Sequence, residues 1–126
     1  MPVSAVRGAT VADSNTREGI LGATAELVRE LCERNAITPD EVVCAFFTMT
    51  KDLNAAFPAY AARQLGWDQV PLLGAVESDV PGTPERMIRV LVQVERPQRQ
   101  RLTPVYLRGT IALRPDLERS AGPGLL

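Results

Sequence analysis

Residues 86–95, Arg-Met-Ile-Arg-Val-Leu-Val-Gln-Val-Glu, form the stretch on which the fold of this chain depends. Every even-numbered residue from 88 to 94 is isoleucine or valine, which is the two-residue period of a β-strand with one wholly apolar face. The other face places Arg89 between Met87 and Leu91. A guanidinium keeps its charge and carries several N–H donors, so water or a partner has to reach it. Either the stem of Arg89 covers apolar surface while its head reaches water, or a cleft holds it to meet an anionic ligand.

The composition of the chain indicates one ordinary soluble domain. It has 126 residues, of which 45% are hydrophobic and 23% are charged, and its formal net charge is −1. A charge so close to zero gives no general attraction for nucleic acid or acidic membranes, and no apolar run is long enough to span a bilayer. We therefore expect a cytoplasmic protein without nucleic-acid or membrane partners, with one domain over residues 1–117 and a flexible tail over 118–126.

The absence of histidine excludes several kinds of catalysis. Neither a Ser-His-Asp nor a Cys-His relay can form, and the commonest general base is missing. Cys32 and Cys44 fall on apolar positions without the spacing of a metal site, so we expect them to be small buried apolar side chains. The sequence has no glycine-rich motif for a dinucleotide or for nucleotide phosphates. Any catalysis must therefore rely on arginine, carboxylates, tyrosine or the positioning of a substrate.

Apolar periodicity predicts an α+β fold. Strands are expected at 3–11, 42–49, 70–75, 86–95 and within 104–113, with a long helix at about 17–35 and a short helix at 58–65. Thr16 is the expected cap of the long helix, and Gly66 the expected stop of the short one. The apolar run 42–49 suits a strand buried on both faces. Because one long helix cannot cover both faces of about five strands, we expect the uncovered face to meet a second copy of the chain.

Four further residues are candidates for a site, although each alone has a simpler explanation. Arg7 interrupts a face of small residues on the strand 3–11 and could equally be a salt-bridge residue. Glu77 follows the strand 70–75 and alone would be a solvated loop acid. Tyr106 alone would pack at a sheet edge with its hydroxyl in water, and Phe57 alone would be a core residue. The short basic run 96–101 is typical of solvated surface.

Short segments spread over most of the chain together resemble one protein family. They occur in the same order and at similar separations in the small monofunctional chorismate mutases of the Bacillus type. These segments are Val6–Thr10, Ala56–Ala59 with Arg63, Val70–Leu72 followed by Glu77, Ile88–Val90, Val105–Leu107 and Leu113–Leu117. Each segment alone is a weak signal, whereas their combination in a chain of matching length is a strong one.

The resemblance implies an assembly and a reaction. Members of this family form homotrimers with a pseudo-α/β-barrel arrangement, in which the active sites lie between neighbouring subunits. They rearrange chorismate to prephenate, a Claisen reaction on the route to phenylalanine and tyrosine. The resemblance also implies that the reaction needs neither a metal nor an organic cofactor.

The resemblance further assigns roles to residues by position. Arg89 matches the arginine that donates to the ether oxygen of the breaking C–O bond. Arg7 and Tyr106 match residues that hold substrate carboxylates, and Glu77 matches the acceptor for the ring hydroxyl. The remaining matched positions line the cleft or its entrance, and they are Phe57, Arg63, Leu73, Leu113 and Arg114. The resemblance also implies that the tail after these residues becomes ordered when the site is filled.

One position departs from the family pattern. Gly74 stands where the Bacillus-type enzymes have a cysteine within hydrogen-bond reach of the ligand. A thiol is a weak donor, so its loss is expected to weaken affinity modestly, and the Gly74 backbone can still contribute. Two alternatives to a mutase stay open. One is a sensor that binds chorismate, prephenate or a similar carboxylate without catalysis. The other is a trimeric enzyme of the imine or enamine deaminase kind, which grips small carboxylates with arginine.

Overall fold

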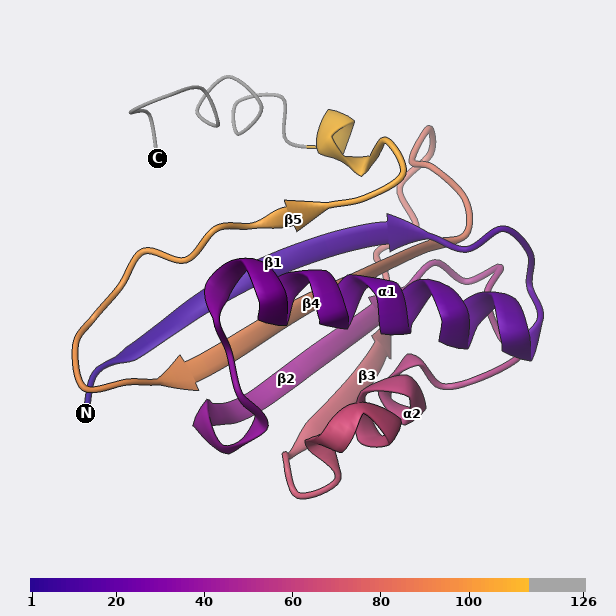
Figure 1. Cartoon of the computed structure of the whole chain (residues 1–126). Coiled ribbons are helices and arrows are strands. Elements are labelled where there is room, and N and C mark those ends of the chain that lie inside the picture. The colour runs from indigo at the N-terminus through magenta and orange to yellow at the C-terminus, as the bar shows by residue number, and fades with distance from the viewer. Residues whose placement is uncertain (114–126) are drawn as a thin grey trace.

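A computed structural model describes residues 1–113 and shows a mixed five-stranded sheet with the strand order β3-β2-β4-β1-β5 (Figure 1). Its elements are, in chain order, β1 (Val3–Val11), α1 (Arg17–Asn35), η1 (Pro39–Glu41), β2 (Val42–Met49), α2 (Pro58–Ala62), η2 (Arg63–Trp67), β3 (Leu72–Val76), β4 (Met87–Glu95), β5 (Val105–Tyr106) and η3 (Thr110–Leu113). The predicted α+β class, with one long and one short α-helix beside the sheet, is confirmed. The tail expected at 118–126 lies outside the described residues. No helix in the described part is long and apolar enough to cross a membrane.

The predicted strand at 86–95 is the middle strand of the sheet. β4 pairs antiparallel with β1 on one side and with β2 on the other, while the edge strands β5 and β3 pair parallel with β1 and β2. The Ile and Val residues at positions 88, 90, 92 and 94 are at most 3% exposed. The apolar face of β4 is therefore buried as predicted, and Arg89 lies on the opposite face near the centre of the sheet.

Both α-helices lie on the same side of the sheet (Figure 1). α1 begins as predicted, because the Thr16 side chain accepts a hydrogen bond of 3.0 Å from the Gly19 N–H. Leu27 and Leu31 of α1 pack into the main core cluster with the apolar face of β4. A Cβ on Gly8 of β1 would lie 3.0 Å from a Leu27 methyl carbon, so glycine lets the helix approach the sheet closely here.

The helix and strand ends differ from the prediction in the second half of the chain. α2 ends at Ala62, and a π-helical turn, η2, carries the chain on to Trp67, which is 1% exposed. Gly66 has a φ of 101° and a ψ of 4°, a non-helical conformation that glycine adopts without strain, so the helical backbone is interrupted at Gly66, where the stop was predicted. β5 has only two residues, because positive φ angles of 54° at Arg108 and 82° at Gly109 turn the chain away from the sheet.

The basic run 96–101 is not wholly solvated as predicted. Arg96 is 8% exposed, and one of its terminal nitrogens donates to the carbonyl oxygens of Asn35 and Ala36 at 2.7 and 2.8 Å. Its Nε donates to a carboxylate oxygen of Glu41 at 3.0 Å. These carbonyls lie at the C-terminal end of α1, where a cation offsets unpaired acceptors. Arg96 therefore fastens the end of β4 to α1 and is a structural cation.

Both cysteines are free thiols, and both are half-buried rather than fully buried as expected. Cys32 packs against the main core cluster, and burial raises the pKa of its thiol, as is usual for an unreactive cysteine. Cys44 faces the opposite side of the sheet, where its thiol donates to the Gln93 side-chain oxygen at 3.3 Å. The prediction of a small core residue therefore fits Cys32 better than Cys44.

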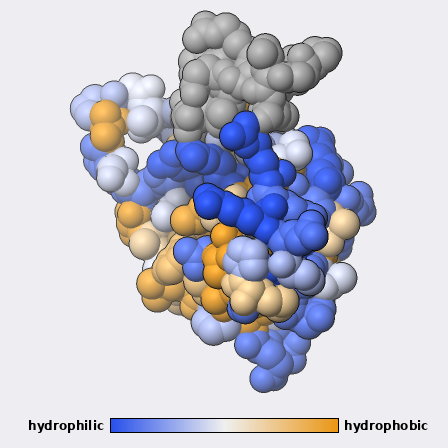
Figure 2. All heavy atoms as spheres, turned by 90° about the vertical axis from the view of Figure 1, so that its left-hand side faces the viewer, coloured by the Kyte–Doolittle hydropathy of each residue, from blue (hydrophilic) through white to orange (hydrophobic). Residues whose placement is uncertain are grey.

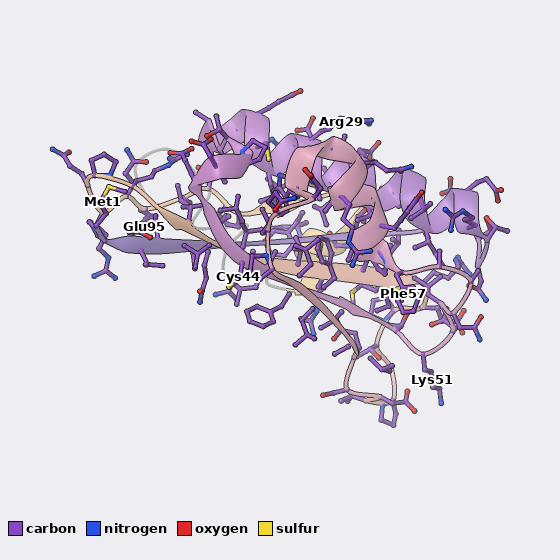
Figure 3. All side chains as sticks on the ribbon, turned by 90° about the horizontal axis from the view of Figure 1, so that it is seen from below. Met1, Arg29, Cys44, Lys51, Phe57 and Glu95 are labelled. Carbon is purple, nitrogen blue, oxygen red and sulfur yellow. The ribbon has the colours of Figure 1, made fainter. Side chains whose placement is uncertain are left out.

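The second face of the sheet carries no helix within the described residues (Figure 3). We call it the open face. Phe46 of β2 and Leu91 of β4 are cross-strand neighbours on it, and each is 40% exposed. Apolar side chains gather on the side of the molecule that faces away from α1 (Figure 2). The run 42–49 is thus buried on one face only in a single chain, since Phe47 is 1% exposed and its neighbour Phe46 is not covered.

Candidate active site

A cavity of about 440 Å³ lies on the open face of the sheet. We call it the open-face cavity. Its lining comes from four strands, and the residues are Arg7, Gly8, Phe46, Thr48, Arg89, Val90, Leu91 and Tyr106. Three of the four predicted catalytic residues, Arg7, Arg89 and Tyr106, are among them. Residues that are up to 99 positions apart in the sequence therefore share one wall.

The strand register explains why these side chains meet. Ala9 of β1 pairs with Arg89 on one side and with Tyr106 on the other, and Thr48 of β2 is the next partner of Arg89. This row crosses the sheet from β2 to β5. The adjacent row pairs Arg7 with Leu91 and Leu91 with Phe46. Side chains in cross-strand rows share one face, so the two rows form the wall of the cavity.

Arg89 is held in place by Glu77, the fourth predicted catalytic residue. The Arg89 Nε donates to the Glu77 Oε2 at 2.7 Å, and the Arg89 Nη2 donates to the Glu77 Oε1. The Glu77 side chain is 6% exposed, whereas that of Arg89 is 49% exposed. This forked pairing fixes the plane of the guanidinium while part of it still faces the cavity.

The same contacts set the ionisation of Glu77. The Arg89 guanidinium lowers the pKa of the Glu77 carboxyl, desolvation opposes that effect, and a hydrogen bond from the Thr48 hydroxyl adds to the lowering. Glu77 in turn raises the pKa of Arg89. Near neutral pH an ionised carboxylate is therefore fixed next to the permanent cation that lines the cavity.

Two other groups in the cavity have unused hydrogen-bonding capacity. The Tyr106 hydroxyl is buried and finds no partner among residues 1–113, and no carboxylate in that range pairs with Arg7. A buried hydroxyl without a partner costs free energy, and such groups are common where a ligand binds. Arg7, Arg89 and Tyr106 can together bind a small ligand with more than one acidic group and direct a cation at one of its oxygen atoms.

Four other predicted residues gather in a second place, a groove of about 410 Å³ between α2 and β3. We call it the α2–β3 groove, and the predicted residues that line it are Phe57, Arg63, Leu73 and Gly74. Alternate residues of β2 separate the two places, because Phe46 and Thr48 line the open-face cavity while Phe47 and Met49 line the groove. The predicted residues therefore form two separate groups in one chain.

The groove carries features that a single chain leaves unused. Phe57, predicted as core when considered alone, is 80% exposed (Figure 3). A Cβ on Gly74 would meet only the Phe47 carbonyl oxygen, at 3.8 Å, so this departure from the family pattern leaves room for a side chain. Leu113 is the last residue of η3, and its side chain as well as Arg114 lie outside what the structure describes.

The sequence did not reveal Thr48, Phe46 and Leu91 as cavity residues. All three sit in strongly apolar strands, and nothing in the sequence says that one face of those strands is open. Thr48 was the one available signal, because a hydroxyl inside the apolar run 42–49 needs a partner.

Comparison with known proteins adds the family. The sequence model of the family "Chorismate mutase type I" matches residues 3–117. This chain belongs to that family. It is 47% identical over 119 residues to the chorismate mutase AroH of Thermus thermophilus, covering 92% of this chain and 97% of the relative. It is 42% identical over 120 residues to AroH of Bacillus subtilis strain 168, covering 93% and 94%.

A solved structure agrees with the family assignment. The chorismate mutase from Clostridium thermocellum superposes on the chain with a TM-score of 0.83 at 41% identity, covering 86% of this chain and 98% of that one. The predicted family and fold are thereby confirmed, and the chain is a chorismate mutase, an isomerase. The sensor and deaminase alternatives are not favoured.

Proposed function

We propose that the chain rearranges chorismate to prephenate in the open-face cavity, with the Arg89 guanidinium donating to the ether oxygen of the breaking C–O bond. The observation that supports this most is the forked pair between Arg89 and Glu77, which fixes a cation at the cavity wall beside Arg7 and Tyr106. Arg7 and the Tyr106 hydroxyl are proposed to hold substrate carboxylates, and Glu77 to accept from the ring hydroxyl.

The chemistry suits a chain that contains no histidine. In a concerted rearrangement the C–O bond breaks while a C–C bond forms, and no proton moves to the enzyme. The protein has to hold the compact reactive conformer and to stabilise negative charge on the ether oxygen. A preorganised donor at a developing oxyanion supplies about 3–4 kcal/mol. Freezing the reactive geometry contributes up to about 7–11 kcal/mol in the best cases, and less for a substrate that is already one molecule.

We propose further that the active site is shared between copies in a homotrimer. The open-face cavity is lined from β1, β2, β4 and β5, whereas the α2–β3 groove lies at the β3 edge of the sheet, so the two groups of predicted residues stay apart within one chain. A neighbour that places its groove against the open face would bring Phe57, Arg63, Leu73 and Gly74 to the cavity. It would also cover Phe46 and Leu91, which a single chain leaves 40% exposed.

The residues after Tyr106 belong to the same proposal. Leu113 and Arg114 follow the short η3 turn and are proposed to contribute an apolar and a basic group at the entrance of the cleft. The reaction is proposed to need no cofactor and to take place in the cytoplasm.

The direct test of the reaction adds chorismate to the purified protein and follows its ultraviolet absorbance, with prephenate identified as the product. Saturable binding without a change in absorbance would favour the sensor. Turnover of imino acids but not of chorismate by the same preparation would favour the deaminase.

The shared site has its own test. Arg89→Ala damages only the open-face group, and the double change Phe57→Ala with Arg63→Ala damages only the groove group. If sites combine the two groups from different copies, unfolding and refolding the two proteins together creates some intact sites. We expect the mixture to exceed the summed activities of the two separately refolded proteins. No gain in the mixture, with mixed trimers verified by mass, would contradict a site shared between copies.

A further inference from the structure

The Glu77 carboxylate depends on a third residue besides its partner Arg89. Glu77 comes directly after β3, and its backbone N–H donates to the Met49 carbonyl oxygen at 2.7 Å. The side chain reaches from there to the Thr48 and Arg89 side chains on the open face, and only 6% of it meets solvent. Water therefore has little access to replace a missing donor. The Thr48 hydroxyl donates to the Glu77 Oε2, the same oxygen that accepts from the Arg89 Nε.

The position of Thr48 in the sheet makes this contact specific. Thr48 lies on β2 between Arg89 on β4 and Ala75 on β3, and Ala75 is two residues before Glu77. It therefore stands between the strand that carries the cation and the strand that leads to the carboxylate. It is half-buried and lines the open-face cavity. A β-branched side chain such as threonine has a restricted χ1 angle, which suits a donor with a fixed direction.

A bound ligand changes what holds Glu77. In the proposed complex the Arg89 guanidinium offers the ligand N–H groups other than the two that bind Glu77, so any shift toward the ligand weakens its hold on the carboxylate. Thr48 lies on β2, between the strands that lead to Glu77 and Arg89, and its hydroxyl donates to the carboxylate without using any N–H group of Arg89. Its bond therefore does not compete with the ligand for Arg89. The hydroxyl can hold the carboxylate while the guanidinium serves two acceptors.

We propose that Thr48 is a positioning residue for the reaction: its hydroxyl fixes the Glu77 carboxylate and, through it, the Arg89 guanidinium in the orientation that the substrate meets. This inference rests on the proposed roles of Arg89 and Glu77. It gives a function to a residue that neither the sequence pattern nor the family match singled out.

The test compares two substitutions that differ in the hydroxyl. Thr48→Val keeps the branched shape and removes the donor, whereas Thr48→Ser keeps the donor and removes a methyl group. We expect kcat/KM for chorismate to fall about tenfold or more in Thr48→Val, as for loss of a hydrogen bond to a charged group. Thr48→Ser should keep most of the wild-type value.

The pH profile separates positioning from simple packing. Without the Thr48 donor the pKa of Glu77 should rise, so the acidic limb of kcat/KM should move to higher pH in Thr48→Val and stay near that of the wild type in Thr48→Ser. A packing defect would lower the thermal midpoint and leave the position of that limb unchanged.

A double-mutant cycle tests whether Thr48 acts through Glu77. In a Glu77→Gln background, Thr48→Val should cause little further loss, because the group that it positions has already been altered. Additive losses would mean that Thr48 contacts the substrate or only packs. The proposal would be overturned if Thr48→Val kept the wild-type kcat/KM and the acidic limb of its pH profile did not move. It would also be overturned if Thr48→Ser lowered kcat/KM as much as Thr48→Val.

Two controls keep the conclusion clear. If Thr48→Val does not fold, Thr48→Ala removes the same donor without added apolar bulk, and the same outcomes apply. Arg89→Ala is measured alongside. If Arg89→Ala keeps full turnover, the site assignment itself fails. If Arg89→Ala is inactive and the Thr48 variants behave like the wild type, only the role of Thr48 fails.

Discussion

The two faces of the sheet differ in what the chain itself provides for them. On the face covered by α1 and α2, the residues of β4 at even positions from 88 to 94 are at most 3% exposed. On the open face, Phe46 and Leu91 are each 40% exposed, and the same face carries Arg7 and Arg89. Packing explains the first face completely. The second face leaves apolar and cationic side chains uncovered in a single chain, which is the arrangement that the proposed ligand and the proposed further copy of the chain would cover.

The largest expected effect comes from removing the cation of the open face. Arg89→Ala should lower kcat for chorismate by about 10²–10³-fold or more, the range for loss of one preorganised oxyanion donor. The thermal midpoint should fall as well, because the change leaves the Glu77 carboxylate, whose side chain is 6% exposed, without its main partner. Activity is therefore compared at a temperature at which the variant is folded. Steady-state kinetics and a thermal melt on the same preparation measure both.

An arginine on the covered side is the matched control for that experiment. Arg29 projects from α1 on the side of the molecule away from the open face (Figure 3). Arg29→Ala should leave kcat and KM unchanged. If Arg89→Ala kept near-full turnover, or if both variants lost the same amount, the difference between the two faces would not be functional.

The next effect separates folding from assembly, with two neighbouring residues on opposite faces. Phe47→Ala should lower the free energy of unfolding by about 3–5 kcal/mol, as for a large side chain removed from a core. Phe46→Ala should cost much less in the isolated chain, since Phe46 is 40% exposed where Phe47 is 1% exposed. It should instead weaken association between copies. Denaturant unfolding and sedimentation over a range of protein concentrations distinguish the two outcomes.

The sequence predicted the covered face well because burial of apolar side chains dominates there. The alternating residues of 86–95 and the spacing of Ile20, Leu27 and Leu31 follow directly from burial of one face, and both elements formed as expected. The open face could not be predicted in the same way. Its pairing of Arg89 with Glu77 depends on where β3 ends beside β2, and residue patterns do not encode that register.

Other misses have local causes. The short α-helix ends at Ala62, before its expected end at residue 65, because the chain passes there into a π-turn, η2, whose last residue, Trp67, is buried. The last strand is short because Arg108 adopts a positive φ of 54°, which an arginine seldom does. The candidate site was reached from the sequence only through the resemblance to a family, since the residues considered singly favoured simpler roles.

A smaller effect follows from two carboxylates whose pKa values are lowered in different regions. The pKa of Glu77 is lowered chiefly by Arg89 at the cavity, and that of Glu41 chiefly by the Thr38 backbone N–H beside α1. A lowered folded-state pKa stabilises the protein above the ordinary value of 4.5, and that stabilisation is lost as the pH falls through the folded value. Glu77→Gln and Glu41→Gln should each make stability less sensitive to acid.

The two carboxylates should nevertheless differ in activity. Glu77→Gln should also lower kcat/KM for chorismate and change the acidic limb of its pH profile, because in the proposed mechanism the carboxylate orients Arg89 and accepts from the ring hydroxyl of the substrate. Glu41→Gln should leave the kinetics unchanged, since Glu41 pairs with the structural cation Arg96. Unfolding free energies and kinetic pH profiles, measured from neutral pH to below 4.5, provide the comparison. Equal kinetic effects from both substitutions would remove the distinction between the two regions.

The smallest effect concerns unpaired buried hydroxyls. Removing one should affect only stability on the covered face, but activity as well on the open face. Thr10 is 0% exposed on the covered face, and within residues 1–113 its hydroxyl has no hydrogen-bond partner. No ligand can reach it there, so Thr10→Val should raise the free energy of unfolding by about 1 kcal/mol by removing an unpaired polar group. Thr24 is equally buried, but its hydroxyl donates to the Ile20 carbonyl at 2.8 Å, so Thr24→Val should bring no such gain. The Tyr106 hydroxyl is also unpaired, yet it lies in the open-face cavity, so Tyr106→Phe should raise the free energy of unfolding in the same way but lower kcat/KM for chorismate. Denaturant unfolding of the three variants, with kinetics on the same preparations, tests this contrast. A loss of activity in Thr10→Val, or none in Tyr106→Phe, would show that an unpaired hydroxyl does not distinguish the functional face from the packed one.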